Sequence, residues 1–111
     1  MQTITRDQLQ AEIAAGAVVV LEALPHNYYV EGHIPGALNL PLDDIASLAP
    51  GLVSERDAAV VTYCTGTSCP NSRIAAEGLR KLGYTNVRAF EGGKENWVEG
   101  GLPLEAGALT S

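Results

Sequence analysis

Basic residues are scarce in this sequence of 111 residues: seven Lys and Arg stand against 13 Asp and Glu, giving a formal net charge of −6 at pH 7. The seven are scattered and form no basic stripe of the kind that binds nucleic acid. The sequence therefore argues against nucleic acid and against an anionic membrane surface as partners. Because the net charge also repels small anions, any anion site must work through local backbone dipoles.

Long hydrophobic runs are also missing, and none approaches the length of a membrane span. The first residues lack the basic, apolar and small-residue order of a signal peptide. We therefore expect one cytoplasmic domain over residues 1–111, monomeric or weakly dimeric, without a membrane partner. Only two cysteines are present. In a reducing compartment such a pair is more typical of reactive thiols or metal ligands than of a structural disulfide.

The hydrophobic pattern predicts alternating strands and helices. Strands are expected at 18–21, 37–40, 59–63 and 87–90, and helices at 6–15, 42–49, 73–82 and after Gly92-Gly93, with 25–32 irregular or a single turn. This order is typical of an α/β fold with an open, mainly parallel sheet and helices on both faces. Functional loops then lie beyond the carboxyl ends of the strands, which brings together Leu24, residues 64–72 and Gly92-Gly93.

The most informative segment runs from Tyr63 into the helix expected at about Arg73. A β-branched strand ends at Cys64, and a loop of small and polar residues leads into that helix. A strand, such a loop and a helix N-terminus form a cup of backbone N–H groups, which the positive end of the helix dipole also faces. We expect a lowered pKa for Cys64, which would react as the thiolate. The expected substrate-binding residues are Thr65, Gly66, Thr67, Ser68, Cys69, Asn71, Ser72 and Arg73.

Two other cysteine chemistries fit the sequence less well. The cysteines could be combined with His26 and His33 into a zinc site, but their spacing matches no common zinc pattern. A tyrosine phosphatase needs an arginine six residues after its cysteine, and that position is Pro70. We therefore expect no metal and no organic cofactor, and chemistry on an anionic, sulfur-containing substrate.

Several other polar residues have structural interpretations. His33 is expected to support a turn and His26 to be an exposed bystander. Glu22 lies at the end of a buried strand, where a carboxylate needs partners. We expect it to bind backbone N–H groups or Arg73. Trp97 is expected in the core.

Four segments in this order match a known family: Gly32-His33-Ile34-Pro35-Gly36-Ala37 with Asn39-Leu40-Pro41, Val61-Thr62-Tyr63-Cys64, Ala75-Ala76-Glu77-Gly78-Leu79 through Leu82-Gly83-Tyr84, and Glu91-Gly92-Gly93 with Trp97 and Gly101-Leu102-Pro103. On these residues the chain resembles a single rhodanese-like (sulfurtransferase) domain from about Ile4 to Pro103. The resemblance implies an open α/β sheet and a persulfide on Cys64. A small donor would supply the sulfane sulfur, and a thiol, a protein thiol or cyanide would accept it.

The chain departs from the family pattern near the site. Glu22 and Leu24 stand where the family often has an aspartate and an arginine, and no cation precedes Arg73 in the loop. The longer loop is similar to that of a rhodanese-like subset with a second cysteine, here Cys69. We therefore expect thiosulfate to be a poor donor and a resolving role for Cys69. The alternatives are a non-catalytic binding or regulatory module, and a redox sensor that uses Cys64 and Cys69.

Overall fold

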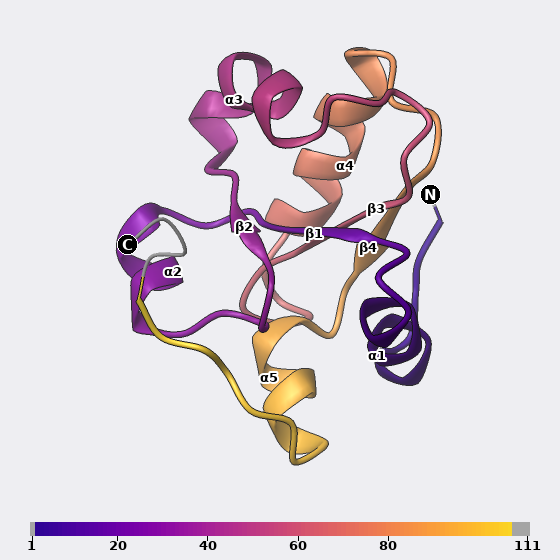
Figure 1. Cartoon of the computed structure of the whole chain (residues 1–111). Helices are drawn as coiled ribbons and strands as arrows, with labels where there is room; N and C mark the ends of the chain where they lie inside the picture. The colour runs from indigo at the N-terminus through magenta and orange to yellow at the C-terminus, as the bar shows by residue number, and fades with distance from the viewer. Residues whose placement is uncertain (1, 108–111) are drawn as a thin grey trace.

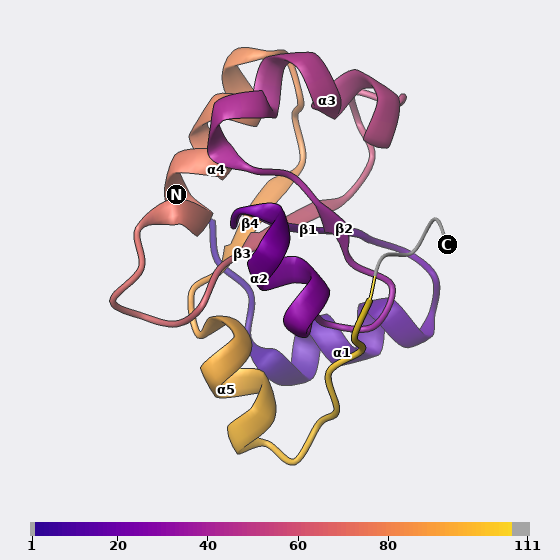
Figure 2. The ribbon, with the colours of Figure 1, turned by 90° about the vertical axis from the view of Figure 1, so that its left-hand side faces the viewer.

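The structure, a computed structural model, describes residues 2–107. Its elements follow one another as shown in Figures 1 and 2. They are α1 (Arg6–Ala14), β1 (Val19–Glu22), α2 (His26–Glu31), β2 (Leu38–Asn39), the 3₁₀ helix η1 (Leu42–Asp44), α3 (Ile45–Leu52), β3 (Val60–Tyr63), α4 (Asn71–Lys81), β4 (Val87–Phe90) and α5 (Gly93–Glu99).

The four strands form one parallel sheet in the order β2-β1-β3-β4. Figure 1 shows α3 and α4 on one side of this sheet and α1 and α5 on the other. The predicted open α/β sheet with helices on both faces is therefore confirmed. Because all strands run the same way, the loops after β1, β3 and β4 leave from one edge, as the sequence predicts.

The strands β1, β3 and β4 contribute residues to two hydrophobic cores, one on each face of the sheet. Val60 joins Leu79 of α4 in one core, whereas Val61 joins Leu9 of α1 and Trp97 of α5 in the other. Continuous apolar runs such as residues 60–61 are therefore what a strand covered on both faces requires. This packing fixes the end of β3, from which the candidate site projects.

The segment 25–32 is more regular than predicted, because residues 26–31 form the helix α2. Its anchor is Tyr29, which is buried and donates a hydrogen bond to the backbone oxygen of Ala37 at 2.6 Å. The Tyr29 ring also stacks on His33 with centroids 3.8 Å apart. These tertiary contacts stabilise a helix too short to form by itself.

The helix expected at 42–49 also differs, because Pro50 does not end it. A 3₁₀ turn is followed by α3, which continues to Leu52 with Pro50 inside it. A proline removes one helical N–H, here the donor to the oxygen of Ala46. Both Ala46 and Pro50 are exposed, so water can satisfy that oxygen.

Helix α4 begins at Asn71, two residues earlier than predicted, with Pro70 at its N-cap. Proline is tolerated at a helix start because the first N–H groups have no intrahelical partner. The C-terminal end of α4, at Lys81, lies one residue from the predicted one, and Gly83 just after it has φ +101°. The early start brings the first N–H groups of α4 to the cysteine loop.

Ion pairs on α4 differ from the two i,i+4 pairs that the spacing predicts, Arg73–Glu77 and Glu77–Lys81. Arg73 instead pairs with Glu91 at 3.2 Å, and Glu77 pairs with Arg80 at 3.4 Å. Arg73 lies in the first turn, beside the end of β4, so a partner on the neighbouring loop replaces the one on its own helix.

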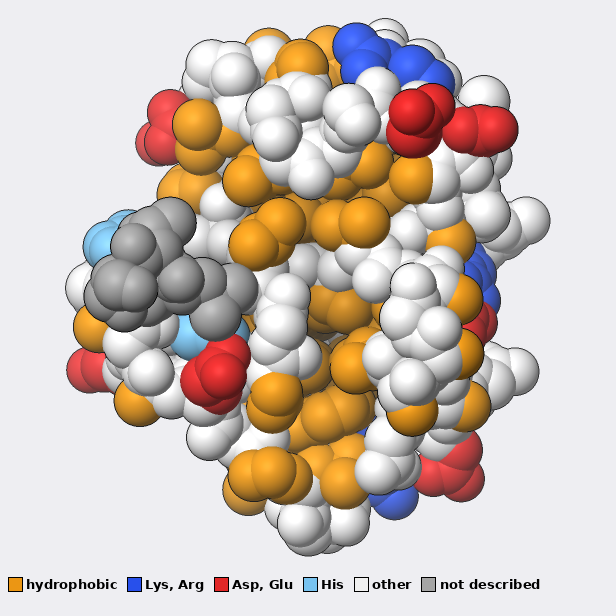
Figure 3. All heavy atoms as spheres, viewed as in Figure 1, with side chains coloured by type: hydrophobic (Ala, Val, Ile, Leu, Met, Phe, Trp, Pro, Cys, Tyr) orange, Lys and Arg blue, Asp and Glu red, His pale blue; other side chains and the backbone are white. Residues whose placement is uncertain are grey.

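The two ends of the described chain are held against the fold. Thr3 forms a parallel bridge to Ala89 of β4, and Glu105 forms an antiparallel bridge to His33. On the face seen in Figure 3, hydrophobic side chains gather across the middle and the visible Lys and Arg side chains lie toward the rim. Within residues 2–107, no helix combines the length and apolar character needed to cross a bilayer.

Candidate active site

Cys64 directly follows β3, at the carboxyl edge where the sequence places it. Its side chain is buried, with only 1% of the residue exposed. The thiol donates to the backbone oxygen of Cys69, 3.3 Å from Sγ, while the Gly66 oxygen lies at 4.0 Å. The backbone N–H of Ser72, in the first turn of α4, donates to the Cys64 sulfur. Cys64 thus lies at the base of the loop, between two backbone oxygens and the first turn of α4.

Cys69 lies against Cys64 because the loop folds back on itself. Its N–H donates to the oxygen of Gly66 at 3.1 Å, which closes a tight turn. The Cys69 sulfur lies near the Cys64 sulfur and is faced by the N–H groups of Asn71 and Thr65 and by the Thr65 hydroxyl. The predicted cup of N–H groups therefore exists, and its donors are divided between the two sulfurs: the N–H groups of Gly66 and Ser72 face Cys64, and those of Thr65 and Asn71 face Cys69.

The expected lowering of the Cys64 pKa is wrong for this arrangement. Burial raises the pKa of the Cys64 thiol, and the neighbouring Cys69 sulfur raises it further, which outweighs the Ser72 N–H. For Cys69, burial opposes ionisation, but the neighbouring Cys64 and the hydrogen-bond donors of Asn71 and Thr65 prevail and lower the pKa. At a given pH, the less buried Cys69 therefore has the larger thiolate fraction of the two.

This charge distribution predicts which thiol reacts first with an alkylating agent. At neutral pH, iodoacetamide is expected to modify Cys69 before Cys64, because the lowered pKa gives Cys69 the larger thiolate fraction and its side chain is the more exposed. In Cys69→Ser, the pH at which Cys64 becomes reactive should fall, because the two effects of Cys69 that raise its pKa are gone. Alkylation rates across pH, read by tandem mass spectrometry, test both statements. Faster modification of Cys64 in the unsubstituted protein would contradict them.

The start of α5 holds the cysteine loop in place. The N–H groups of Lys94 and Glu95 donate to the oxygens of Cys64 and Thr65 at 3.0 and 2.9 Å. Figure 2 shows the loop between β3 and α4 beside α5. Gly93 makes this approach possible, since a Cβ there would lie 2.5 Å from the Cys64 oxygen. The predicted meeting of residues 64–72 with Gly92-Gly93 is therefore confirmed.

Gly93→Ala is expected to destabilise the protein by about 1–3 kcal/mol or more, because φ is +61° and the added methyl group meets backbone atoms. Gly51→Ala is the matched control. Its Cβ would meet nothing within 4 Å, and in helix α3 it should stabilise by about 0.5–1 kcal/mol. Urea denaturation of both variants measures the difference. Equal unfolding free energies would contradict the tight contact between α5 and the loop.

Glu22 has partners other than those expected. Its fully buried carboxylate accepts from the Tyr63 hydroxyl at 2.8 Å and pairs with Lys94 Nζ at 3.1 Å, and Arg73 lies elsewhere. Burial raises the pKa of Glu22, and hydrogen bonding to Tyr63 and the charge of Lys94 counteract it. Lys94 was missed by sequence reasoning. The sequence feature that could have pointed to Lys94 is its position directly after Gly92-Gly93.

The basic residues nearest the loop are both engaged by carboxylates. Lys94 is turned inward to Glu22, and its side chain is only 14% exposed. Arg73 pairs with Glu91 on the surface, where side chains on both partners are more than a third exposed. Solvent-exposed pairs of this kind contribute little to stability but do neutralise charge locally. Among the described residues, the loop itself carries no cation.

The two histidines lie apart from the cysteines and have partners of their own. His33 is buried, with Nδ1 2.8 Å from the Tyr29 oxygen and Nε2 3.2 Å from Glu105. His26 is exposed, with Nδ1 3.1 Å from Asn39 Oδ1. These positions fit the structural interpretation of both residues. Across residues 2–107, no cluster of three His, Cys, Asp or Glu side chains suits a metal ion.

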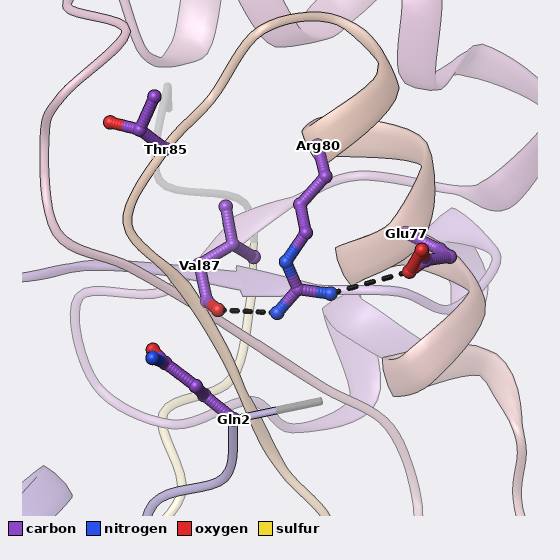
Figure 4. A pocket seen from close by; sticks show the side chains of 5 residues that line it. All are labelled: Gln2, Glu77, Arg80, Thr85 and Val87. Carbon is purple, nitrogen blue, oxygen red and sulfur yellow. Dashed lines mark hydrogen bonds and ion pairs between the residues drawn. The ribbon is translucent and has the colours of Figure 1, made fainter.

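Two cavities lie beside α4, one near each of its ends. One of about 300 Å³ adjoins the cysteine loop and is lined by Pro25, Pro41, Leu42, Asp43, Asp44 and Asn71. Another, of about 480 Å³, lies at the other end of α4 (Figure 4) and is lined by Gln2, Glu77, Arg80, Thr85 and Val87. There Arg80 is bound to Glu77 and to the Val87 oxygen. The first cavity has acidic side chains and no basic one, and it shares Asn71 with the loop.

Known proteins share this sequence and fold. The chain is 36% identical over 105 residues to the HTH-type transcriptional regulator Rv0324 of Mycobacterium tuberculosis, covering 95% of this chain but 45% of the regulator. The chain thus spans less than half of the length of that relative. It is 31% identical over 93 residues to thiosulfate sulfurtransferase GlpE of Shewanella oneidensis, covering 84% of this chain and 88% of GlpE.

A solved structure gives the same result for the fold. The BH2092 protein from Bacillus halodurans superposes with a TM-score of 0.85 at 25% identity, covering 95% of this chain and 77% of that chain. The family model described as the rhodanese-like domain matches residues 5–100. The parallel sheet, the cysteine at the end of β3 and these similarities agree, and the chain belongs to the rhodanese-like domain family.

Proposed function

We propose that this chain is a sulfurtransferase in which Cys64 carries a sulfane sulfur as a persulfide. The observation that carries the proposal is the position of the Cys64 sulfur, at the end of β3 and against the N–H of Ser72 in the first turn of α4. An anionic sulfur in this place is stabilised by the helix dipole and by a direct hydrogen bond. The names of several relatives, such as GlpE, support sulfur transfer as the reaction.

In the proposed loading step, Cys64 gives up its proton to the neighbouring Cys69 sulfur or to solvent. The Cys64 thiolate then attacks the terminal sulfur of a donor persulfide, and the donor leaves as a thiolate. In the transfer step, an acceptor thiol or cyanide attacks that terminal sulfur, and Cys64 leaves as the thiolate. One S–S bond forms and one breaks in each step, so no external oxidant or reductant is needed.

The cysteine chemistry also bears on location and partners. Both sulfurs must stay reduced to work in this way, so we propose a cytoplasmic setting, where thiols persist. The small, exposed residues of the loop, Thr67 and Ser68, leave the mouth open to a small donor or to a protein thiol.

The proposed function is tested by supplying a low-molecular-weight persulfide and cyanide and following thiocyanate. Repeated turnover above the protein-free reaction is expected. Thiocyanate that never exceeds the amount of protein would instead favour a second candidate, a sulfur-sensing module that loads but turns over slowly. The similarity to a transcriptional regulator supports that candidate. Thiocyanate no faster than in the protein-free reaction would contradict the enzyme outright.

A further inference from the structure

Cys69 is a nucleophile that sulfur transfer through Cys64 does not consume. Its backbone oxygen lies 3.3 Å from the Cys64 sulfur, five positions earlier in the chain, and its own sulfur is near enough to raise the pKa of Cys64. It is also partly exposed, whereas Cys64 is buried beneath the folded-back loop. An external acceptor therefore meets Cys69 before it reaches the sulfur of Cys64.

We propose that Cys69 resolves the Cys64 persulfide internally: its thiolate attacks the Cys64 sulfur, hydrosulfide leaves, and a Cys64–Cys69 disulfide closes the loop. This inference rests on the proposed function, because it requires a persulfide on Cys64. It adds a second outcome for the bound sulfur. Besides transfer to an acceptor, the sulfur is released as sulfide.

The step balances without an external oxidant. The bond between Cys69 Sγ and Cys64 Sγ forms as the bond from Cys64 Sγ to the terminal sulfur breaks. The terminal sulfur takes the electron pair and leaves as hydrosulfide, while the Cys69 sulfur is oxidised to the disulfide level. A thiol reductant, consumed as its own disulfide, then returns both cysteines to thiols.

The contacts favour attack on the Cys64 sulfur rather than on the terminal one. The turn from Gly66 to Cys69 and the 3.3 Å contact between the Cys64 sulfur and the Cys69 backbone oxygen make the two cysteines neighbours in the folded loop. An intramolecular nucleophile held in contact has a large advantage over a thiol from solution. Hydrosulfide is also the conjugate base of a stronger acid than an ordinary thiol, which makes it the better leaving group.

The first turn of α4 serves both sulfurs during this step. The Asn71 N–H donates to Cys69 and the Ser72 N–H donates to Cys64, so one helix N-terminus stabilises the charge wherever it resides. Ser72 also has a buried hydroxyl without a partner among the described residues.

The test is a single turnover in the absence of free thiols. The protein is loaded with glutathione persulfide, desalted rapidly, and followed by intact mass and by sulfide assay. The loaded chain is expected to release sulfide in an amount equal to the protein and to end with two hydrogens fewer than the reduced chain. Cys69→Ser is expected to keep its sulfur, to release sulfide no faster than the protein-free control, and to yield thiocyanate when cyanide is added. Cys64→Ser, the matched control, should neither load nor release sulfide.

The outcomes separate this inference from the function on which it rests. If both the unsubstituted chain and Cys69→Ser load and give thiocyanate, but neither releases sulfide, the resolving step is wrong and sulfur transfer stands. Equal sulfide release by both would also overturn the role of Cys69. If neither loads, the proposed function fails and the resolving step fails with it.

Discussion

Inorganic thiosulfate is expected to be a poor donor, with a kcat/KM about thirtyfold to a thousandfold below that for a low-molecular-weight persulfide. Thiosulfate carries two negative charges, and its leaving group, sulfite, gathers charge at the loop mouth. A cation there would stabilise this charge, and losing one such contact costs about 2–4 kcal/mol. A persulfide with less charge on its leaving group loses less from the same absence.

The structure explains why no basic side chain of the described residues is available to stabilise negative charge at the loop mouth. Lys94 is bound to buried Glu22, Arg73 is paired with Glu91, and Leu24 is a buried apolar side chain. The cavity beside the loop adds acidic side chains, and the net charge of −6 repels the dianion from a distance. The helix dipole remains, but it supplies only partial charge.

Ser68→Arg, at an exposed position of the loop, should reduce the difference in kcat/KM between the persulfide and thiosulfate. Ser54→Arg, at an exposed position before β3 and at the opposite edge of the sheet, should leave that difference unchanged. Both variants alter the net charge equally, so their difference isolates the local effect. Asn71 is less suitable, because its side chain donates to the Ala23 oxygen at 2.9 Å. A native preference for thiosulfate would contradict this account of the electrostatics.

Cys64→Ser is expected to abolish thiocyanate formation, down to the protein-free rate. A serine hydroxyl at this buried position cannot become the sulfur-bearing thiolate, and the Ser72 N–H donates to position 64 and not to Cys69. Cys69→Ser should retain transfer to cyanide, since the sulfur that forms the persulfide is still present. Circular dichroism and urea denaturation establish that each variant is folded. Undiminished turnover by Cys64→Ser would contradict the proposed role.

Much of the fold could be predicted from residue patterns. The apolar runs near Val19, Val60 and Val87 predict buried parallel strands, and the capping box of Thr5 and Gln8 is present as expected. Once the strands are parallel, the common edge of their carboxyl ends follows from geometry. The position of Cys64 at that edge was therefore predictable.

The relative pKa values of the two cysteines and the pairing of charged side chains were not predictable, because they depend on how the loop folds. The turn from Gly66 to Cys69 brings the two cysteines together, and burial and their mutual influence raise the pKa of Cys64 and lower that of Cys69. The pair of Glu22 and Lys94 joins residues more than 70 positions apart. No local pattern contains such a contact. The pairing partners of charged side chains are therefore the part of this site that only the structure could provide.

The central claim is that Cys64 carries the sulfur, and the most direct test is to locate it. The protein is treated with a persulfide, alkylated at once and cleaved after arginine, which leaves both cysteines in one peptide of residues 57–73. Tandem mass spectrometry then assigns the added sulfur to one of the two positions. We predict an alkylated persulfide on Cys64, both in the unsubstituted chain quenched early and in Cys69→Ser. An added sulfur found on Cys69, with Cys64 unmodified, would contradict the account.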